Sequence, residues 1–233
     1  MTLLTVIKDA CDTVGITRPS SAYASTDQQV IQLVGLAQRE GKELAKRHTW
    51  QALTKEKTFT STAAETQTGA IPDDFDRIID ETFYNRTQTR GVQGPLSAIE
   101  WQFNKSVVAS TIIQAFRQRG NSILITPTPA AGETFAYEYV SRNWCQSSGG
   151  TEQSAWAADT DTGLLDEELM TLGLVWRWQK AKGLDYAESF RTYEMQVAQV
   201  ITRDGGKPRL NVGRTGSIRN ARAPYVPDGN WTP

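Results

Sequence analysis

The 233-residue sequence is poor in the residues that build metal sites and nucleophilic pairs. It contains one histidine, His48, and two cysteines, Cys11 and Cys145. These three residues cannot supply the four ligands of a usual zinc site, and no pair or triad of histidines can form. We therefore expect no metal and no cofactor, and we interpret His48 as structural. The two cysteines are expected to be reduced thiols in a cytoplasmic protein.

The sequence also lacks a long apolar run. Its longest stretch without a charged residue, 120–132, has 13 residues and contains two prolines, whereas a membrane-spanning helix needs about 20 apolar residues. We expect no membrane span, and no secretory signal because the first residues lack a basic region. With 39% hydrophobic and 22% charged residues, the composition is typical of a folded protein of one large or two small domains.

A large net charge is absent too, which argues against a dedicated nucleic-acid-binding protein. The formal total is −1, but it is unevenly distributed. Residues 203–233 contain six basic and two acidic side chains, whereas the preceding 202 residues contain 19 and 24. The basic segment also holds five of the 18 glycines and four of the nine prolines. We predict that 205–233 is an extended basic arm that becomes ordered only against a partner.

Apolar residues at spacings of three and four predict helices at both ends of the remaining chain. A first helix is expected over 3–14. A second is expected to begin with a capping box of Thr26 and Gln29 and to end near His48, with Trp50 as a core anchor. A third is expected from Leu164 to Lys182, ended by Gly183.

Asp185 is then expected to cap a last helix. Its predicted inner face carries residues spaced by four, three, four and three positions: Tyr186, Phe190, Tyr193, Val197 and Val200.

Between the helix pairs the pattern changes to a period of about two, which is typical of strands. The expected strands are 57–60, 77–84, 111–117, 122–126 and 134–141. Turns are expected at 72–74 and 119–121, a short helix at 95–103, and a polar surface connection from 143 to 163.

These patterns predict an α+β chain, in which an antiparallel helical bundle carries an inserted small antiparallel β-sheet region and an extended C-terminal arm. The expected division is a helix pair, a β-rich insertion, a surface connection, a second helix pair and the arm: 1–50, 51–144, 145–163, 164–204 and 205–233.

Few motifs in the chain indicate chemistry. Residues 159–163 (DTDTG) resemble the start of a calcium-binding loop, but the twelfth position is Met170 rather than glutamate. We interpret the segment as a flexible lead-in in which Asp161 or Thr162 caps the next helix. Glu167 and Glu168 follow in the first turn, where the helix dipole favours acids. We predict no catalytic residues and no enzymatic activity.

The third predicted helix is apolar on nearly all sides, which indicates burial on several faces. It is a candidate for packing between subunits, and an ordinary core position is the alternative. The residues concerned are Leu165, Leu169, Leu172, Trp176 and Trp178.

Several short patterns follow one another along about residues 1–212. They are AKRHTW at 45–50, IPDDF at 71–75, PLSAIEW at 95–101, GNSILITPTP at 120–129, FAYEY at 135–139, ADTD at 158–161, LGLVWRW at 172–178 and GLDY at 183–186. In this order they resemble the head-to-tail adaptor (connector) proteins of tailed bacteriophages, which form the ring beneath the portal.

The resemblance implies a structural role in the virion neck after assembly in the host cytoplasm. Such adaptors dock onto the portal as a ring, typically of twelve copies, extend the DNA exit channel and provide the platform for the tail. The implied partners are the portal protein, a tail, nozzle or tail-terminator protein, and further copies of the chain, with a passing contact to genomic DNA and none to a membrane. The expected docking residues of the arm are Arg203, Lys207, Arg209, Arg214, Arg219, Arg222 and Tyr225.

Two other functions remain open on the sequence alone. The chain could be a tail-tube or tail-completion protein that polymerises with itself. It could also be a virion-associated cell-wall hydrolase, which would require two carboxylates facing each other across a cleft. No such pair is evident in the sequence.

Overall fold

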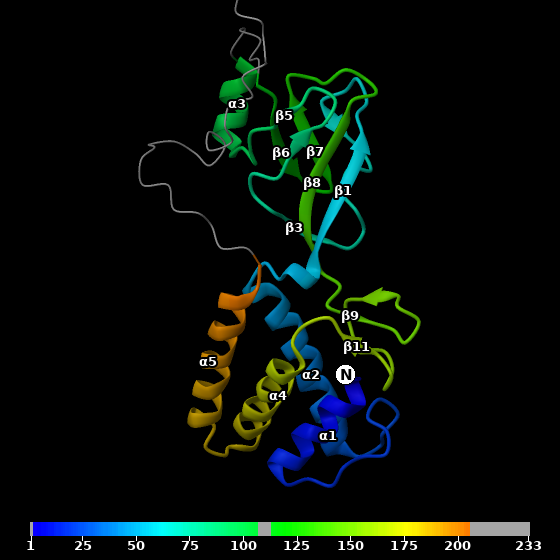
Figure 1. Ribbon diagram of the computed structural model, residues 1–233, viewed down its shortest axis with the longest axis vertical. Helices are drawn as coiled ribbons and strands as arrows, with labels where there is room; N and C mark the ends of the chain where they lie inside the picture. Colours follow the sequence, from blue (N-terminus) through cyan, green and yellow to red (C-terminus); the bar gives the residue numbers. More distant parts are fainter. Residues whose placement is uncertain (1, 107–112, 206–233) are drawn as a thin grey trace, which may run out of the picture. The chain divides into compact units, whose positions relative to one another are not determined.

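The computed structural model describes residues 2–106 and 113–205 (Figure 1). Contacts divide them into two compact units. The helical unit comprises 2–57, 71–79 and 138–205, and the β-unit comprises 58–70, 80–106 and 113–137. The predicted α+β class is confirmed, with small antiparallel sheets inserted between helices. Apart from Gly205, the predicted arm lies outside the described residues, and the five-segment division stays a prediction.

The described residues form five α-helices, one 3-10 turn and eleven short strands. The helices are α1 (Leu3–Val14), α2 (Gln28–Arg47), α3 (Ala98–Ser106), α4 (Glu167–Lys182) and α5 (Ala187–Arg203), with the 3-10 turn at Gln51–Leu53. The strands are β1 (Thr54–Thr60), β2 (Thr66–Gln67), β3 (Phe75–Ile78), β4 (Tyr84–Asn85), β5 (Arg90–Gly91), β6 (Ala115–Arg119), β7 (Ser122–Thr126), β8 (Thr134–Ser141), β9 (Cys145–Gln146), β10 (Glu152–Gln153) and β11 (Thr162–Gly163).

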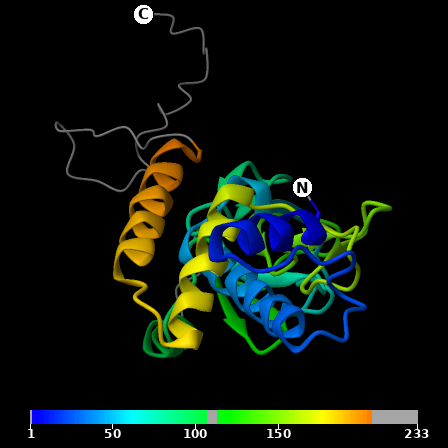
Figure 2. The same cartoon turned by 90° about the horizontal axis from the view of Figure 1, so that it is seen from below.

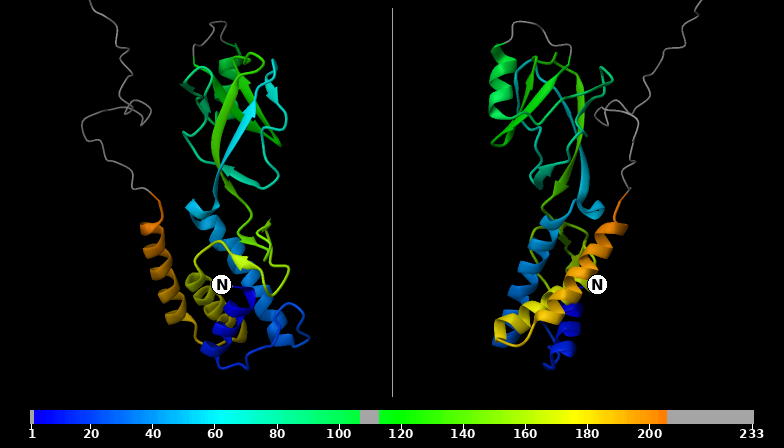
Figure 3. Two further views of the ribbon diagram at one scale, coloured as in Figure 1. Left: turned by 45° about the vertical axis from the view of Figure 1, so that its right-hand side comes forward. Right: turned by 90° about the vertical axis from the view of Figure 1, so that its left-hand side faces the viewer.

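Within the helical unit, α4 packs against α1, α2 and α5 (Figures 2 and 3). Its core combines the apolar faces predicted for the helices with Trp50, which is 4% exposed and donates its indole N–H to the Leu44 carbonyl oxygen at 2.7 Å. Four helices therefore share one core. The antiparallel order expected of this bundle stays a prediction.

Side-chain caps set the starts of α1, α2 and α4. Thr2 caps α1, and Asp27 caps α2 by accepting a 2.9 Å hydrogen bond from the Gln29 backbone N–H. The prediction of Thr26 as the cap of α2 was therefore wrong by one position, because aspartate can take the same role. Asp166 caps α4, so the expected caps Asp161 and Thr162 were also wrong.

Strand pairing is antiparallel in every strand pair of the described chain whose register is determined. One sheet has the order β1-β8-β4-β5 with β3 also on β8, and a second has the order β2-β7-β6. The hairpin predicted at 119–121 is confirmed between β6 and β7, with Gly120 at φ 58°. The single strand predicted over 77–84 was wrong, because a turn with Glu81 at φ 64° separates β3 from β4.

Aromatic rings form the centre of the β-unit. Phe83 stacks on Phe116 with ring centroids 4.4 Å apart and on Tyr137 at 5.4 Å. Phe59 stacks on Phe135 at 5.5 Å. Phe135 and Tyr137 are two positions apart on β8, and because alternate residues of a strand share a face, the period of two places both rings on the same side of this strand.

The segment predicted as a surface connection contains a third sheet with the order β10-β9-β11. It also contributes Trp144 and Trp156 to the core of the helical unit, with their rings edge-to-face 5.0 Å apart. The sequence prediction missed this contribution, because two-residue strands are too short to show a period.

Candidate functional site

The helix predicted to pack between subunits lies inside the helical unit. Four of its five residues are at most 8% exposed in the single chain, and Leu172 is half-buried. They are Leu165, Leu169, Leu172, Trp176 and Trp178. Their burial is that of core residues, the alternative left open above, and their contact with another subunit stays a prediction.

Of the predicted docking residues of the arm, only Arg203 is described. It lies exposed in the last turn of α5. The others lie outside the described residues: Lys207, Arg209, Arg214, Arg219, Arg222 and Tyr225.

An ion-pair network joins three helices at the centre of the helical unit. Glu40 of α2 is fully buried, and its carboxylate accepts a 2.6 Å hydrogen bond from Arg177 Nε of α4. The other carboxylate oxygen accepts a 2.5 Å hydrogen bond from the Tyr193 hydroxyl of α5. Arg177 also donates to Glu43 Oε2 at 2.8 Å. Glu40 thus links α2 to α4 through Arg177 and to α5 through Tyr193.

The pKa values of the two carboxylates in this network are shifted in opposite directions. Burial raises the pKa of Glu40, although Tyr193 and Arg177 oppose the shift. The hydrogen bond from Arg39, and then that from Arg177, hold the pKa of Glu43 below its usual value. Removing either member of a buried pair leaves the other charge unpaired, which costs about 3–5 kcal/mol.

Two helical glycines make room for this network and its neighbours. A Cβ on Gly173 of α4 would overlap the Glu40 carboxylate, and a Cβ on Gly41 of α2 would overlap the Trp144 ring. The network was not foreseen from the sequence. Gly41 and Gly173 allow these close approaches, but a helical glycine does not by itself indicate one, since a Cβ on Gly35 of α2 would meet open space.

Polar contacts also hold α5. Arg47 donates two hydrogen bonds to the Glu194 carboxylate, at 2.8 and 2.6 Å. At the end of the helix, the Asp204 carboxylate accepts a 3.0 Å hydrogen bond from the Gln51 backbone N–H and lies 3.6 Å from His48 Nε2. His48 therefore lies among the contacts that hold the end of α5.

A groove lies between α2 and α5, with Trp176 of α4 among its lining residues. Its volume is about 390 Å³. The Trp176 indole meets the Phe190 ring edge-on at a centroid distance of 5.1 Å, and Lys180 Nζ lies 5.8 Å from the Trp176 ring. Trp176 Nε1 is buried and has no hydrogen-bond partner among the described residues. Aromatic rings therefore form part of the groove lining.

Apolar side chains are exposed beside this groove, at the turn between α4 and α5 and along α5. Leu184 is 56% exposed, Tyr186 37%, Phe190 39% and Met195 54%. The prediction that Tyr186 and Phe190 belong to the buried face of the last helix was wrong, because that face is buried at Tyr193 and Val197 but exposed at its start.

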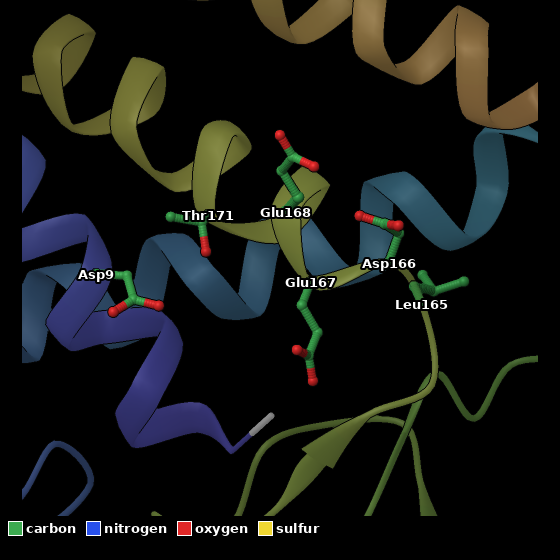
Figure 4. A pocket seen from close by; sticks show the side chains of 6 residues that line it. All are labelled: Asp9, Leu165, Asp166, Glu167, Glu168 and Thr171. Atoms are coloured by element: carbon green, nitrogen blue, oxygen red, sulfur yellow. The ribbon is translucent and has the colours of Figure 1, made fainter.

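An acidic pocket of about 650 Å³ lies where α1 meets the start of α4 (Figure 4). Four carboxylates line it, those of Asp9, Asp166, Glu167 and Glu168. Glu167 and Glu168 point to different sides of the helix (Figure 4). We call these four residues the acidic end of α4. Capping by Asp166 and the helix dipole account for acids at this helix start, but Asp9 adds a further acid from α1.

Asp74, in the turn at 71–75, joins distant parts of the helical unit. Its carboxylate accepts hydrogen bonds from Lys55 Nζ at 2.7 Å and from the Tyr139 and Ser141 hydroxyls at 2.9 Å each. Burial alone would raise the pKa of Asp74, but these hydrogen bonds outweigh it and hold the pKa below its usual value. This motif is therefore a structural tie.

The ADTD motif at 158–161 is a second tie. The Asp159 carboxylate accepts hydrogen bonds from the Ser21 hydroxyl at 2.6 Å and from the Ala22 and Tyr23 backbone N–H groups. The Asp161 carboxylate accepts from two N–H groups of its own loop. Both acids are committed to backbone and hydroxyl donors.

Groups of titratable side chains that could hold a metal ion do not occur within 2–106 and 113–205. In the same ranges, no helix is both long and apolar enough to cross a bilayer. The ordered polar groups of the chain mainly hold segments together.

The family model described as SU10 adaptor protein matches residues 1–214. The chain belongs to the SU10 adaptor protein family. No curated protein matches it. The resemblance to phage head-to-tail adaptors is thereby confirmed.

As a member of the SU10 adaptor family, the chain is a structural protein of the phage virion neck that interacts with portal and tail components. The match includes the helical unit, the β-unit and the first part of the basic segment. The ties at Asp74 and at Asp159 lie inside the matched residues and build the scaffold of the adaptor.

Proposed function

We propose that this protein docks as a ring onto the phage portal, extends the DNA exit channel and provides the platform for tail attachment. The observation that carries the proposal is the match of the SU10 adaptor family over residues 1–214. The proposed role is structural and non-enzymatic. A ring of twelve copies, assembly in the host cytoplasm and a passing contact with genomic DNA are part of the same proposal.

The charge distribution supports a docking role for the arm. The sequence before residue 203 carries 24 acidic and 19 basic side chains, whereas 203–233 carries six basic and two acidic ones. Opposite charges steer and align a contact more than they strengthen it. Repetition around a ring then multiplies a modest affinity, because each bound copy raises the effective concentration of the next contact. We propose that Arg203 and the basic residues beyond it contact the portal or a neighbouring subunit.

The decisive experiment mixes the purified protein with its cognate portal and follows complex formation by sedimentation and electron microscopy. A ring bound to the portal is the expected result. Absence of any complex would contradict the proposal. A ring in the absence of portal is not required, since the portal can act as the template.

A chain that ends at Gly205 tests the arm. We expect its circular dichroism to match that of the full chain, because the core of the helical unit lies before residue 205. Its binding to the portal should be lost. Full binding by the shortened chain would place the portal contact elsewhere, while a changed dichroism spectrum would show that the arm is needed for folding.

A further inference from the structure

We propose that the aromatic end of the helical unit binds the acidic end of α4 of a second copy of this chain. The aromatic end comprises Trp176, Lys180, Lys182, Leu184, Tyr186 and Phe190. The inference rests on the proposed function and deepens it, because it names the two surfaces through which neighbours in the ring meet.

Exposed apolar surface is the first observation behind this inference. Leu184, Tyr186 and Phe190 are each at least 37% exposed in the single chain. They lie close together, at the turn between α4 and α5 and in the first turn of α5. Grouped large apolar side chains on a surface mark a contact with another molecule, whereas single exposed ones are ordinary. Aromatic residues are also enriched at the centres of interfaces.

The two lysines of the aromatic end would be stabilised by a negatively charged partner. Lys180 and Lys182 have no carboxylate partner among the described residues and lie over aromatic rings instead, with Lys182 Nζ 4.3 Å from the centroid of Trp178. A partner that supplies carboxylates would pair with both lysines.

The acidic end of α4 has that chemistry. Four carboxylates and no basic side chain line its pocket. A second copy of the chain therefore presents a surface complementary in charge to the aromatic end, without any foreign partner.

The two surfaces lie at opposite ends of α4, a helix of 16 residues. At 1.5 Å per residue, its length is about 24 Å. One copy can therefore use its aromatic end on one neighbour and its acidic end on another. A contact between two different surfaces is heterologous, and repetition closes it into a ring or extends it into a filament. This geometry agrees with the ring of the proposed function.

Disulfide trapping between two surface cysteines tests the contact directly. One chain carries Lys182→Cys and the other carries Glu168→Cys, while the natural cysteines are fully buried and do not compete. Mixing the two chains under mild oxidation should give at least about tenfold more disulfide-linked dimer than either chain alone, because only the mixture places the two thiols in one contact. Equal yields in all three samples would overturn the proposal. Trapping detects a transient contact, so a stable ring in solution is unnecessary.

Charge reversal gives an independent readout. Lys180→Glu/Lys182→Glu and Asp9→Lys/Glu168→Lys should each weaken neighbour contact about tenfold, measured as cross-linking between copies. Mixing the two variants should restore it, since acidic and basic ends alternate again around a ring. Lys42→Glu, on an exposed part of α2 outside both surfaces, is the matched control and should change nothing. Loss of contact in the variants without recovery on mixing would contradict the proposal.

Portal sedimentation of the same variants separates this inference from the proposed function. Portal binding without trapping between copies would overturn only the inference. Trapping without portal binding would overturn the proposed function and leave the contact between copies standing.

Discussion

Three carboxylates of the helical unit each accept hydrogen bonds from segments that are far apart in the sequence. Glu40 binds Arg177 and Tyr193, Asp74 accepts from Lys55, Tyr139 and Ser141, and Asp159 accepts from residues 21–23. This role could not be predicted from the sequence, because a buried carboxylate that links segments and a solvent-exposed carboxylate are the same residue type. A helical glycine is not a sufficient signal either, because Gly173 allows the approach of Glu40 whereas a Cβ on Gly35 would meet open space.

Gly173→Ala should destabilise the protein, because the added methyl group would overlap the Glu40 carboxylate. We expect a loss of about 1–3 kcal/mol in the free energy of unfolding, as for other overpacked sites. Urea unfolding followed by circular dichroism measures it. Gly35→Ala in α2 is the matched control: open space surrounds its added Cβ, so it should stabilise by about 0.5–1 kcal/mol. Equal effects at both sites would contradict the steric explanation.

Asp74→Asn should remove a stabilising contribution that depends on pH. The folded-state pKa of Asp74 lies below its usual value, so ionisation stabilises the fold above the unfolded pKa of about 3.9 and the gain is lost as pH falls through the folded pKa. We expect a deficit of about 1–3 kcal/mol at neutral pH. The deficit should shrink below about pH 4. Urea unfolding at a series of pH values checks this, and a deficit that is the same at every pH would refute the assignment.

Helices and strands were predicted correctly where the local sequence has a clear hydrophobic period. The first helix and the strands β7 and β8 were predicted at their observed bounds, because each has a clear period. The small sheet of β9, β10 and β11 was missed, since two-residue strands are held by tertiary contacts that the local sequence does not encode. The start of the inner face of α5, at Tyr186 and Phe190, was misjudged for a related reason. A helical period shows that residues share a face, but not how much of that face finds a partner.

Hydrogen exchange should show that α5 opens more readily than α4. Eight residues of α4 are buried, whereas α5 buries Tyr193 and Val197 and depends on polar contacts for the rest. Elements with few buried apolar contacts open at lower free energy. Mass spectrometry of exchanging amides should give faster exchange in α5 than in α4 or α1. Slower exchange in α5 would mean that its polar contacts are stronger than burial suggests.

At the scale of the whole molecule, the sequence was sufficient to predict the family, but it was not sufficient to predict which residues form the exposed surfaces of the protein. The order of short motifs led to the phage adaptors, and the family match over 1–214 confirmed this. The helix expected to contact other subunits was chosen for its apolar residues, but the fold uses those residues as its own core. A contact surface is what remains after the core has formed, so it can be read only once the packing is known.

Portal binding by the full chain should weaken as salt rises. The arm carries the excess of positive charge, and added salt shortens the Debye length from about 10 Å at 0.1 M to about 3 Å at 1 M. Sedimentation of the adaptor with portal at low and high sodium chloride provides the measurement. Binding that is insensitive to salt would indicate an apolar contact in place of the charged arm.

The hydrogen bonds at the start of α1 have a consequence for the order of folding. The Leu3 and Leu4 backbone N–H groups donate to the Asp161 and Asp159 carbonyl oxygens, so the beginning of the chain is held by residues more than 150 positions later. Contacts of such high sequence separation form slowly, because a long loop must close first. During synthesis α1 is made early, yet these two hydrogen bonds cannot form until the chain has been made as far as residue 161.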